Sequence, residues 1–244
     1  MTGPAPADPV SRDKLAARMF LILHDPFTGK ALVRASAVRI AVAGAELADL
    51  ALARPGRGQL VALENDRVVL AGTRPRRLDY ISSFVVDSIR SQPEAHSATV
   101  WTAALADHVF DLVLAQLITE GVVQRQQGGL FGRSSRRFPA VDLLAAAGPR
   151  VRLEHALRSD TRADGAGAPD DERALDEETA VLLAVLAAVG GERTLDLDRA
   201  ARRRLTAAAA DALPLDLRNL VTGIEVAHAS GELPQTLRLR TSDK

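Results

Sequence analysis

Cysteine is absent from this chain of 244 residues, which excludes disulfides and thiolate metal sites. Aromatic residues contribute only 3% of the sequence, whereas hydrophobic residues contribute 47% and are dominated by alanine and leucine. Both of these residues lose little conformational freedom in a helix, so the composition predicts a mainly α fold with a substantial core. Basic and acidic residues balance at 31 each, so only a local patch of charge can indicate a charged partner.

The sequence predicts neither a signal peptide nor a membrane-spanning helix. Residues 1–14 contain prolines and charges but no apolar stretch. The longest apolar run, residues 180–189, is far shorter than the ~20 residues that span a bilayer. We therefore expect a cytoplasmic protein whose membrane contact, at the inner face, is peripheral. Residues 1–12 are predicted to be disordered, residues 13–235 to form one domain, and residues 236–244 to form a tail.

Motifs for catalysis and cofactor binding are also missing. Residues 28–30 resemble the end of a phosphate loop, but the glycine required five positions before Gly29 is absent. The five histidines do not have the spacing of a metal site. His108 lies between Asp107 and Asp111, which admits a catalytic or metal-binding interpretation, although a structural histidine on a helix flank is more common. We predict no enzymatic activity, no cofactor and no metal.

Residues 99–121 predict a long apolar helix around which the chain is organised. Its apolar residues recur on every side, so it has no wide polar face and is expected to be surrounded by other elements. Gly121 supplies a natural stop after the last apolar turn. The side chains predicted to be buried are Trp101, Leu105, Val109, Leu112 and Leu117.

A basic β-hairpin is predicted directly after this helix, over residues 122–141. Valines begin the first strand, three glycines within residues 128–132 supply the turn, and residues 136–141 return. The segment contains four arginines and no acidic residue, and its turn carries an apolar pair. We expect this hairpin to project and to contact a membrane or a second subunit. These arginines and apolar residues are Arg125, Arg133, Arg136, Arg137, Leu130 and Phe131.

The rest of the chain alternates predicted helices with turns. Helices are expected at residues 15–23, 34–52, 78–89, 141–157, 179–189, 199–213 and 217–229, with a break at Gly148 and Pro149. Two strands, at residues 59–63 and 67–71, are joined at Asn65 and Asp66. Residues 54–77 hold six arginines, which either share the basic face of the hairpin or coat another surface. Residues 159–178 hold eight acids among glycine and proline, which predicts a mobile, solvated linker.

The residues alone are compatible with three functions. Arginines with an apolar tip suit a peripheral membrane protein, but they equally suit a loop that packs on a neighbouring subunit. A helix followed by an arginine-rich hairpin also describes a winged helix, although Gln116 is the only residue on the helix suited to base recognition. The acidic segment 159–178 could bind a basic peptide, as part of a lipid-independent interaction scaffold.

Four short stretches, in this order, resemble the Golgi phosphoprotein 3 family. They are residues 21–25 (LILHD) with Gly29, residues 49–52 (DLAL) with Arg57 and residues 59–60, residues 117–122 (LITEGV) and residues 182–186 (LLAVL). The resemblance covers about residues 12–230 and rests on order and spacing. The alanine- and arginine-rich composition is similar to that of a bacterial, actinobacterial member.

The resemblance implies a single, mainly helical domain in which a central apolar helix bundle is wrapped by amphipathic helices and carries a projecting β-hairpin. Eukaryotic members bind phosphatidylinositol 4-phosphate on Golgi membranes and hold the cytosolic tails of glycosyltransferases. Their hairpin contributes to membrane contact and self-association. By this resemblance, the chain is expected to bind anionic phospholipid without catalysis, and its hairpin is a candidate surface for a homo-oligomer.

Four positions depart from the eukaryotic pattern. The resemblance places a family tryptophan at Arg34 and phosphate-binding arginines at Ala43, Asp107 and Phe110. Asp107 would repel a phosphate there, so the resemblance implies an inherited fold without the inherited headgroup selectivity. The residues expected to contact lipid are those of the hairpin, together with Arg34.

Overall fold

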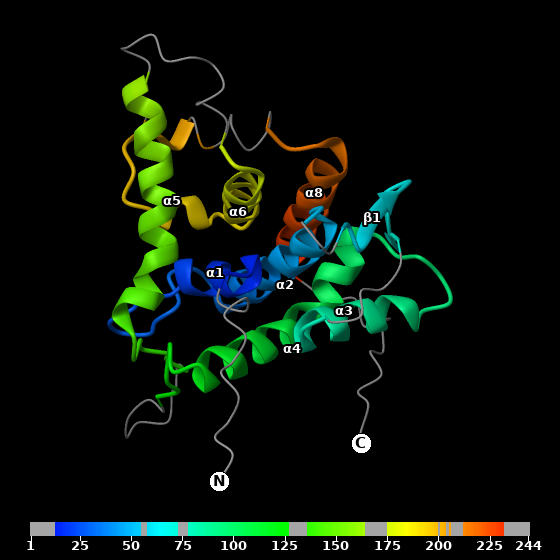
Figure 1. Cartoon of the computed structure of the whole chain (residues 1–244), viewed down its shortest axis with the longest axis horizontal. Helices are drawn as coiled ribbons and strands as arrows, with labels where there is room; N and C mark the ends of the chain where they lie inside the picture. Colours follow the sequence, from blue (N-terminus) through cyan, green and yellow to red (C-terminus); the bar gives the residue numbers. More distant parts are fainter. Residues whose placement is uncertain are drawn as a thin grey trace.

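The protein is mainly helical and carries one two-stranded antiparallel sheet (Figure 1). This computed structural model describes residues 13–54, 58–72, 78–126, 136–163, 175–199, 201–203, 205 and 212–231. The helices are α1 (Leu15–Ile22), α2 (Ala35–Ala51), α3 (Tyr80–Arg90), α4 (Ala98–Thr119), α5 (Leu143–Ala163), α6 (Glu177–Ala188), the 3-10 helix η3 (Gly191–Thr194) and α8 (Leu215–Ser230). The strands are β1 (Val61–Glu64) and β2 (Arg67–Leu70). The predicted fold class is confirmed.

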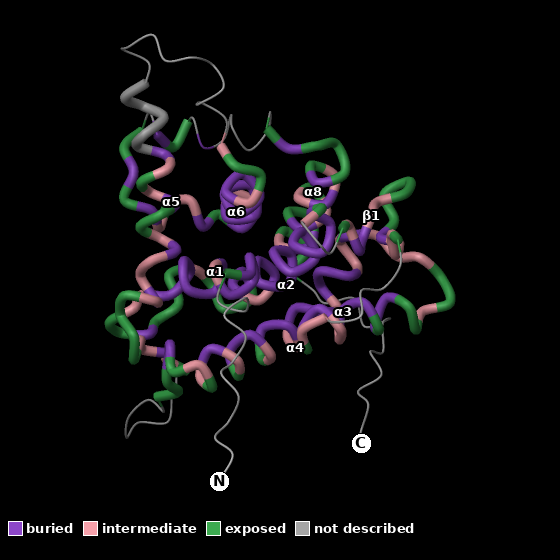
Figure 2. The backbone as a smooth tube through the Cα atoms, in the orientation of Figure 1, coloured by how far each residue is buried: buried purple, intermediate pink, exposed green. Residues whose placement is uncertain are grey.

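Helix α2 is the element around which the described core is built. Fourteen of its 17 residues are buried, and it packs against α1, α4, α6 and α8 (Figure 2). Gly44 allows α8 to approach closely, because a Cβ at this position would lie 2.6 Å from the Ile224 Cδ1 atom. Alanine, valine and leucine supply most of the buried surface, as the composition predicted.

Helix α4 borders the bundle, so the prediction that other elements surround it is wrong. Trp101, Leu105, Val109 and Leu117 are buried as expected, but Leu112 is only half-buried and packs at the margin of the core. The open face of the helix carries Asp107 and Asp111, one turn apart, followed by Ala115 and Thr119. Asp111 is exposed to water and Asp107 is partly exposed beside Arg39, because burying a carboxylate without a partner is costly.

By length and composition alone, α4 could cross a bilayer, and no other helix in the described ranges passes the same test. Within the fold, 56% of its most apolar window is buried against other elements, as in the core helix of a globular domain. Helix α4 therefore contributes to the core, with one long face left open.

The strand pair β1–β2 confirms the hairpin expected near residues 59–71. Val61 pairs with Leu70 and Glu64 with Arg67 in an antiparallel register. Asn65 and Asp66 both have positive φ, 50° and 62°, as the two-residue turn between twisted strands requires. These residue types tolerate the left-handed region better than most, which explains the local sequence.

Helix α5 differs from its prediction at two points. It continues through Pro149, where a break was expected, and Pro149 itself is buried with Ala146, Leu153 and Leu157 on the inner face. This burial offsets the one backbone hydrogen bond that proline removes. The helix also reaches residue 163, so residues 159–163 are not part of a linker. The rest of the predicted linker to residue 174 lies outside the described residues.

Arg54, which the sequence assigned to a surface, forms ion pairs inside the bundle. Arg54 donates to the buried carboxylate of Asp49 and also to Glu178, with 2.6 Å between Arg54 Nη1 and Glu178 Oε1. Arg18 approaches the other oxygen of Glu178 at 2.9 Å. Arg54 therefore joins α2 to α6 and does not belong to a basic face. Arg67 donates to the Ala95 carbonyl, and the other four arginines of residues 54–77 lie outside the described ranges.

Candidate functional site

The loop between α1 and α2 is closed tightly by its own backbone. The Asp25 amide donates to the Lys30 carbonyl at 2.9 Å, and the Gly29 amide donates to the Asp25 carbonyl at 2.8 Å. Gly29 adopts a φ of +64°, and a Cβ there would lie 2.1 Å from the Pro139 nitrogen. Only glycine fits this position, because both the backbone conformation and the close neighbour exclude a side chain.

The chain returning after residue 135 packs directly on this loop. The Phe138 amide donates to the Gly29 carbonyl and the Ala140 amide to the Pro26 carbonyl, both at 2.9 Å. These bonds join two segments that are more than 100 positions apart in the sequence. The returning chain also pairs with residues 122–126, where Val123 opposes Ala140 and Gln126 opposes Arg137 in antiparallel bridges.

The two arms of the predicted basic hairpin therefore exist, but their base belongs to the core. Val122, Val123 and Phe138 are buried, so the prediction that all of residues 122–141 project is wrong at this end. Their apolar side chains explain the difference, because they gain more from packing against α4 and the α1–α2 loop than from water. The expected contact residues Leu130, Phe131 and Arg133 lie outside the described residues.

A cavity of about 510 Å³ opens where the α1–α2 loop, α2, α4 and the returning arm meet. Its volume lies within the range usual for small-ligand sites. The lining combines three basic residues with aromatic and aliphatic ones. The lining residues are His24, Lys30, Ala31, Ala35, Val38, Arg39, Phe110, Arg136 and Phe138.

The basic residues of this cavity fall into two kinds. Arg39 forms an ion pair with Asp107 and stacks its guanidinium 5.3 Å from the centre of the Phe110 ring, so its position is fixed. Lys30 and Arg136 are exposed, and neither side chain forms an ion pair with another described residue. Among the described residues that line this cavity there is no carboxylate, and Asp107 lines a separate cavity that shares Arg39 with it.

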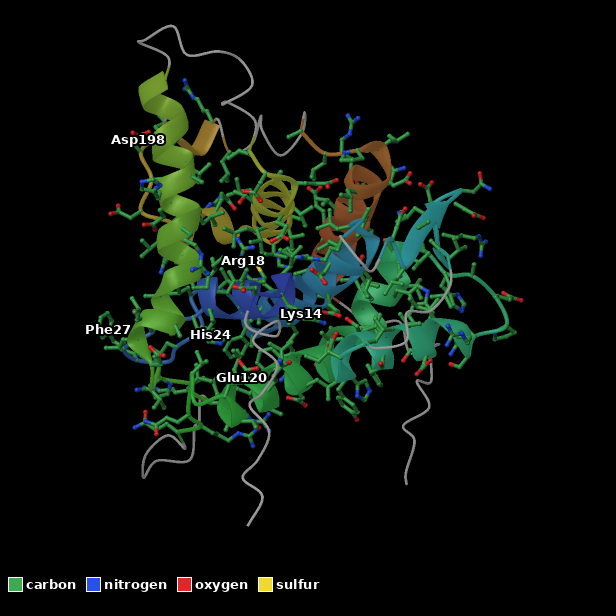
Figure 3. All side chains as sticks on the ribbon, in the orientation of Figure 1. Lys14, Arg18, His24, Phe27, Glu120 and Asp198 are labelled. Atoms are coloured by element: carbon green, nitrogen blue, oxygen red, sulfur yellow. The ribbon has the colours of Figure 1, made fainter. Side chains whose placement is uncertain are left out.

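The inner end of the cavity is aromatic and electrically neutral. His24 stacks on Phe20 with 4.2 Å between ring centroids, and its Nδ1 lies 2.8 Å from the Phe20 carbonyl oxygen. Burial lowers the pKa of His24 to about 4, so its ring is neutral at physiological pH. Phe138 meets His24 edge-on at 5.7 Å. The site therefore presents positive charge at its mouth and an apolar surface behind it. Figure 3 shows where His24, at the inner end, lies in the fold.

The structure brings some of the predicted contact residues together and separates others. Arg125 and Arg136 are exposed on the two described arms, and Arg137 is half-buried beside them. Arg34 is exposed at the start of α2 but does not line the cavity. Ala43 is fully buried in the core, so this position cannot meet a ligand.

Sequence reasoning missed Lys30 and Arg39. Lys30 drew attention only as part of an incomplete phosphate loop. Arg39 lies one helical turn before Ala43 and one turn from Ala35, so its place on the cavity side of α2 follows from helical spacing once that face is known. Arg39 also balances Asp107, whose expected repulsion of phosphate is therefore reduced.

The arrangement suits binding of an anion with an apolar attachment. Within the described ranges, no group of three His, Asp or Glu side chains could hold a metal ion. The remaining titratable group in the cavity, His24, hydrogen-bonds a backbone carbonyl and is turned toward the core.

Comparison with known proteins gives one family. The family model described as Golgi phosphoprotein 3 (GPP34) matches residues 15–231, which is most of the chain. No curated protein matches the sequence.

Proposed function

The chain belongs to the Golgi phosphoprotein 3 family, and we propose that it is a non-enzymatic, peripheral membrane adaptor that binds anionic lipid headgroups. The observation that carries this proposal is the cavity of Lys30, Arg39 and Arg136 with its aromatic inner wall. A bacterial member with this activity would act at the inner, cytoplasmic face of the cell membrane. The family is not a known enzyme family, which agrees with an adaptor role.

The chemistry of the cavity supports a phosphate-bearing lipid. Arg136 offers a planar fork of donors that matches phosphate oxygens, and Lys30 adds a mobile point charge at the same mouth. Arg39 contributes less net charge, because Asp107 already pairs with it. Phe110 and Phe138 can cover the apolar part of a bound headgroup and exclude water behind it.

Headgroup selectivity is proposed to be low. Of the four family positions, Ala43 is buried, Phe110 presents a ring, and Asp107 is held in an ion pair. Arg34, at the fourth position, does not line the cavity. Binding to phosphatidylinositol 4-phosphate should therefore not exceed binding to other anionic lipids of matched charge.

The test is co-flotation with phosphatidylglycerol-containing vesicles after removal of Lys30 and Arg136, the two cavity cations that form no ion pair with a described residue. Each cation near an anionic surface contributes up to about 1 kcal/mol, so Lys30→Gln with Arg136→Gln should weaken partition by up to about thirtyfold. Arg203→Gln with Arg218→Gln removes the same charge from exposed sites that do not line the cavity. This control should float like the wild type.

Two results would contradict the proposal. If both double variants lose binding equally, only net charge matters and the cavity has no special role. If the wild type shifts duplex DNA at the same salt concentration but does not float, the protein binds nucleic acid. The acids on the open face of α4, Asp107 and Asp111, oppose a groove-reading helix and favour the lipid.

A further inference from the structure

The loop between α1 and α2 and the start of α5 carry apolar side chains that face water. Phe27 is 75% exposed and Leu144 is 85% exposed, and Val141 and Leu143, which precede Leu144 in the sequence, are 59% and 47% exposed. Phe27 lies beside the start of α5 (Figure 3). Such an apolar group on the surface of a soluble fold indicates a binding surface more often than chance exposure does.

We propose that these four residues, Phe27, Val141, Leu143 and Leu144, form an apolar wedge that inserts between the lipids of an anionic bilayer. The inference rests on the proposed lipid-binding function and deepens it, because it assigns the inserting element. It adds two segments that the sequence did not identify as contact surfaces, the α1–α2 loop and the start of α5, to Val141 at the end of the predicted hairpin.

The backbone holds the two halves of the wedge together. The Ala140 amide donates to the Pro26 carbonyl at 2.9 Å, which joins the residue before Phe27 to the residue before Val141. The Val141 amide donates to the Val122 carbonyl, also at 2.9 Å. The wedge is therefore pre-organised, and its insertion does not require a loop to become ordered first.

Positive charge borders the wedge on the side of the cavity. Lys30 closes the same loop as Phe27 through the hydrogen bond between its carbonyl and the Asp25 amide. Arg136 precedes the Phe138 amide, which donates to Gly29 in that loop. An apolar insertion surface edged by Lys and Arg is the arrangement that partitions into an anionic interface.

Two carboxylates near the wedge are engaged by local backbone. Asp25 Oδ1 accepts hydrogen bonds from the Thr28 amide at 2.6 Å and from the Thr28 hydroxyl at 2.7 Å. Asp142 Oδ1 accepts from the Ala145 amide at 3.0 Å and caps the first turn of α5. Both acids shape the wedge, but a hydrogen bond does not remove a carboxylate's charge, so they offset Lys30 and Arg136. The excess of basic side chains comes from Arg125 and Arg137 on the two adjoining arms.

A bilayer suits this surface better than a second copy of the chain. In a two-fold contact both copies present the same patch with the same excess of basic side chains. Like net charge on the two faces opposes association, whereas lipid phosphates neutralise it. The occupant that matches both the apolar residues and their basic border is an anionic membrane.

The absence of cysteine allows a direct test in the full chain. Phe27→Cys and Leu144→Cys, each labelled with an environment-sensitive fluorophore, should brighten and shift to the blue with phosphatidylglycerol-containing vesicles. Tyr80→Cys is the matched control, since Tyr80 is 74% exposed but starts α3. Its label should not change. Phe27→Ser with Leu144→Ser should lower partition at least about tenfold, and Tyr80→Ser should leave it unchanged.

The outcomes separate this inference from the proposed function. If the wild type floats but the labels at 27 and 144 behave like the one at 80, lipid binding stands and the wedge is refuted. If those labels respond to protein concentration without vesicles, and Phe27→Ser with Leu144→Ser lowers the sedimenting mass, the surface joins subunits. If the wild type does not float, both proposals fail.

Discussion

Replacing Glu46 with glutamine should change how the stability of the fold depends on pH. Glu46 is fully buried in α2, where it accepts a hydrogen bond from the Ser82 hydroxyl at 2.8 Å and lies 3.8 Å from the Lys14 ammonium. The pKa of Glu46 is raised to about 7: burial is the largest cause, Lys14 opposes it, and the carboxylates of Asp49 and Asp79 add to it.

The sign of the effect follows from proton binding. Between its usual pKa of 4.5 and the folded value of about 7, Glu46 holds its proton in the folded state and loses it in the unfolded state. The favourable contribution of protonated Glu46 is therefore complete below pH 4.5 and is lost as the pH rises through 7. The difference between the unfolded and folded pKa values corresponds to about 3 kcal/mol of unfolding free energy.

Urea unfolding of the wild type and of Glu46→Gln from pH 4 to pH 8 measures this contribution. Relative to the wild type, the unfolding free energy of the variant should rise by about 3 kcal/mol from pH 4 to pH 8, because glutamine is neutral throughout. Glu64→Gln removes an exposed carboxylate at the end of β1 and serves as the control. If the difference between wild type and Glu46→Gln does not vary with pH, Glu46 is ionised in the folded protein and the reasoning is wrong.

Two further predictions concern packing. Leu105→Ala should cost about 3–5 kcal/mol of unfolding free energy and Leu112→Ala much less, because Leu105 is fully buried and Leu112 half-buried on the same helix. Equal losses in urea unfolding would contradict the open face of α4. Gly29→Ala should destabilise the fold and loosen residues 136–140, seen as faster amide exchange at Phe138, because its Cβ would meet Pro139 at 2.1 Å; unchanged exchange would show that the loop and the arm do not pack as described.

Elements marked by local chemistry could be predicted from the sequence. The turn at Asn65 and Asp66 was identified correctly, because few residue pairs suit its backbone. The buried positions Trp101 and Leu105 followed from apolar spacing. The partial exposure of Leu112 could not be predicted in this way, because apolar residues recur on every side of α4. Which side is covered depends on the elements that pack against it. Pro149 was misread as a break, since its burial depends on the tertiary contacts of α5.

The candidate site was largely hidden in the sequence. Lys30 and Arg39 lie in the α1–α2 loop and in α2, whereas Arg136 belongs to a distant segment that the hydrogen bond from Phe138 to Gly29 brings to the loop. No feature of the sequence around Lys30 predicts that the arm after residue 135 packs against its loop. The basic character of residues 122–141 was visible, but the pocket at its base, and the apolar surface at Phe27 beside it, required the fold.

The most direct test of lipid binding is the partition of the wild-type chain into vesicles as phosphatidylglycerol progressively replaces phosphatidylcholine at fixed salt concentration. Partition should rise steeply with the anionic fraction and fall when salt is added, because Lys30 and Arg136 carry unpaired charge at the mouth of the cavity. Binding that is absent at every composition, or equal on neutral and anionic vesicles, would contradict a membrane adaptor that recognises anionic headgroups.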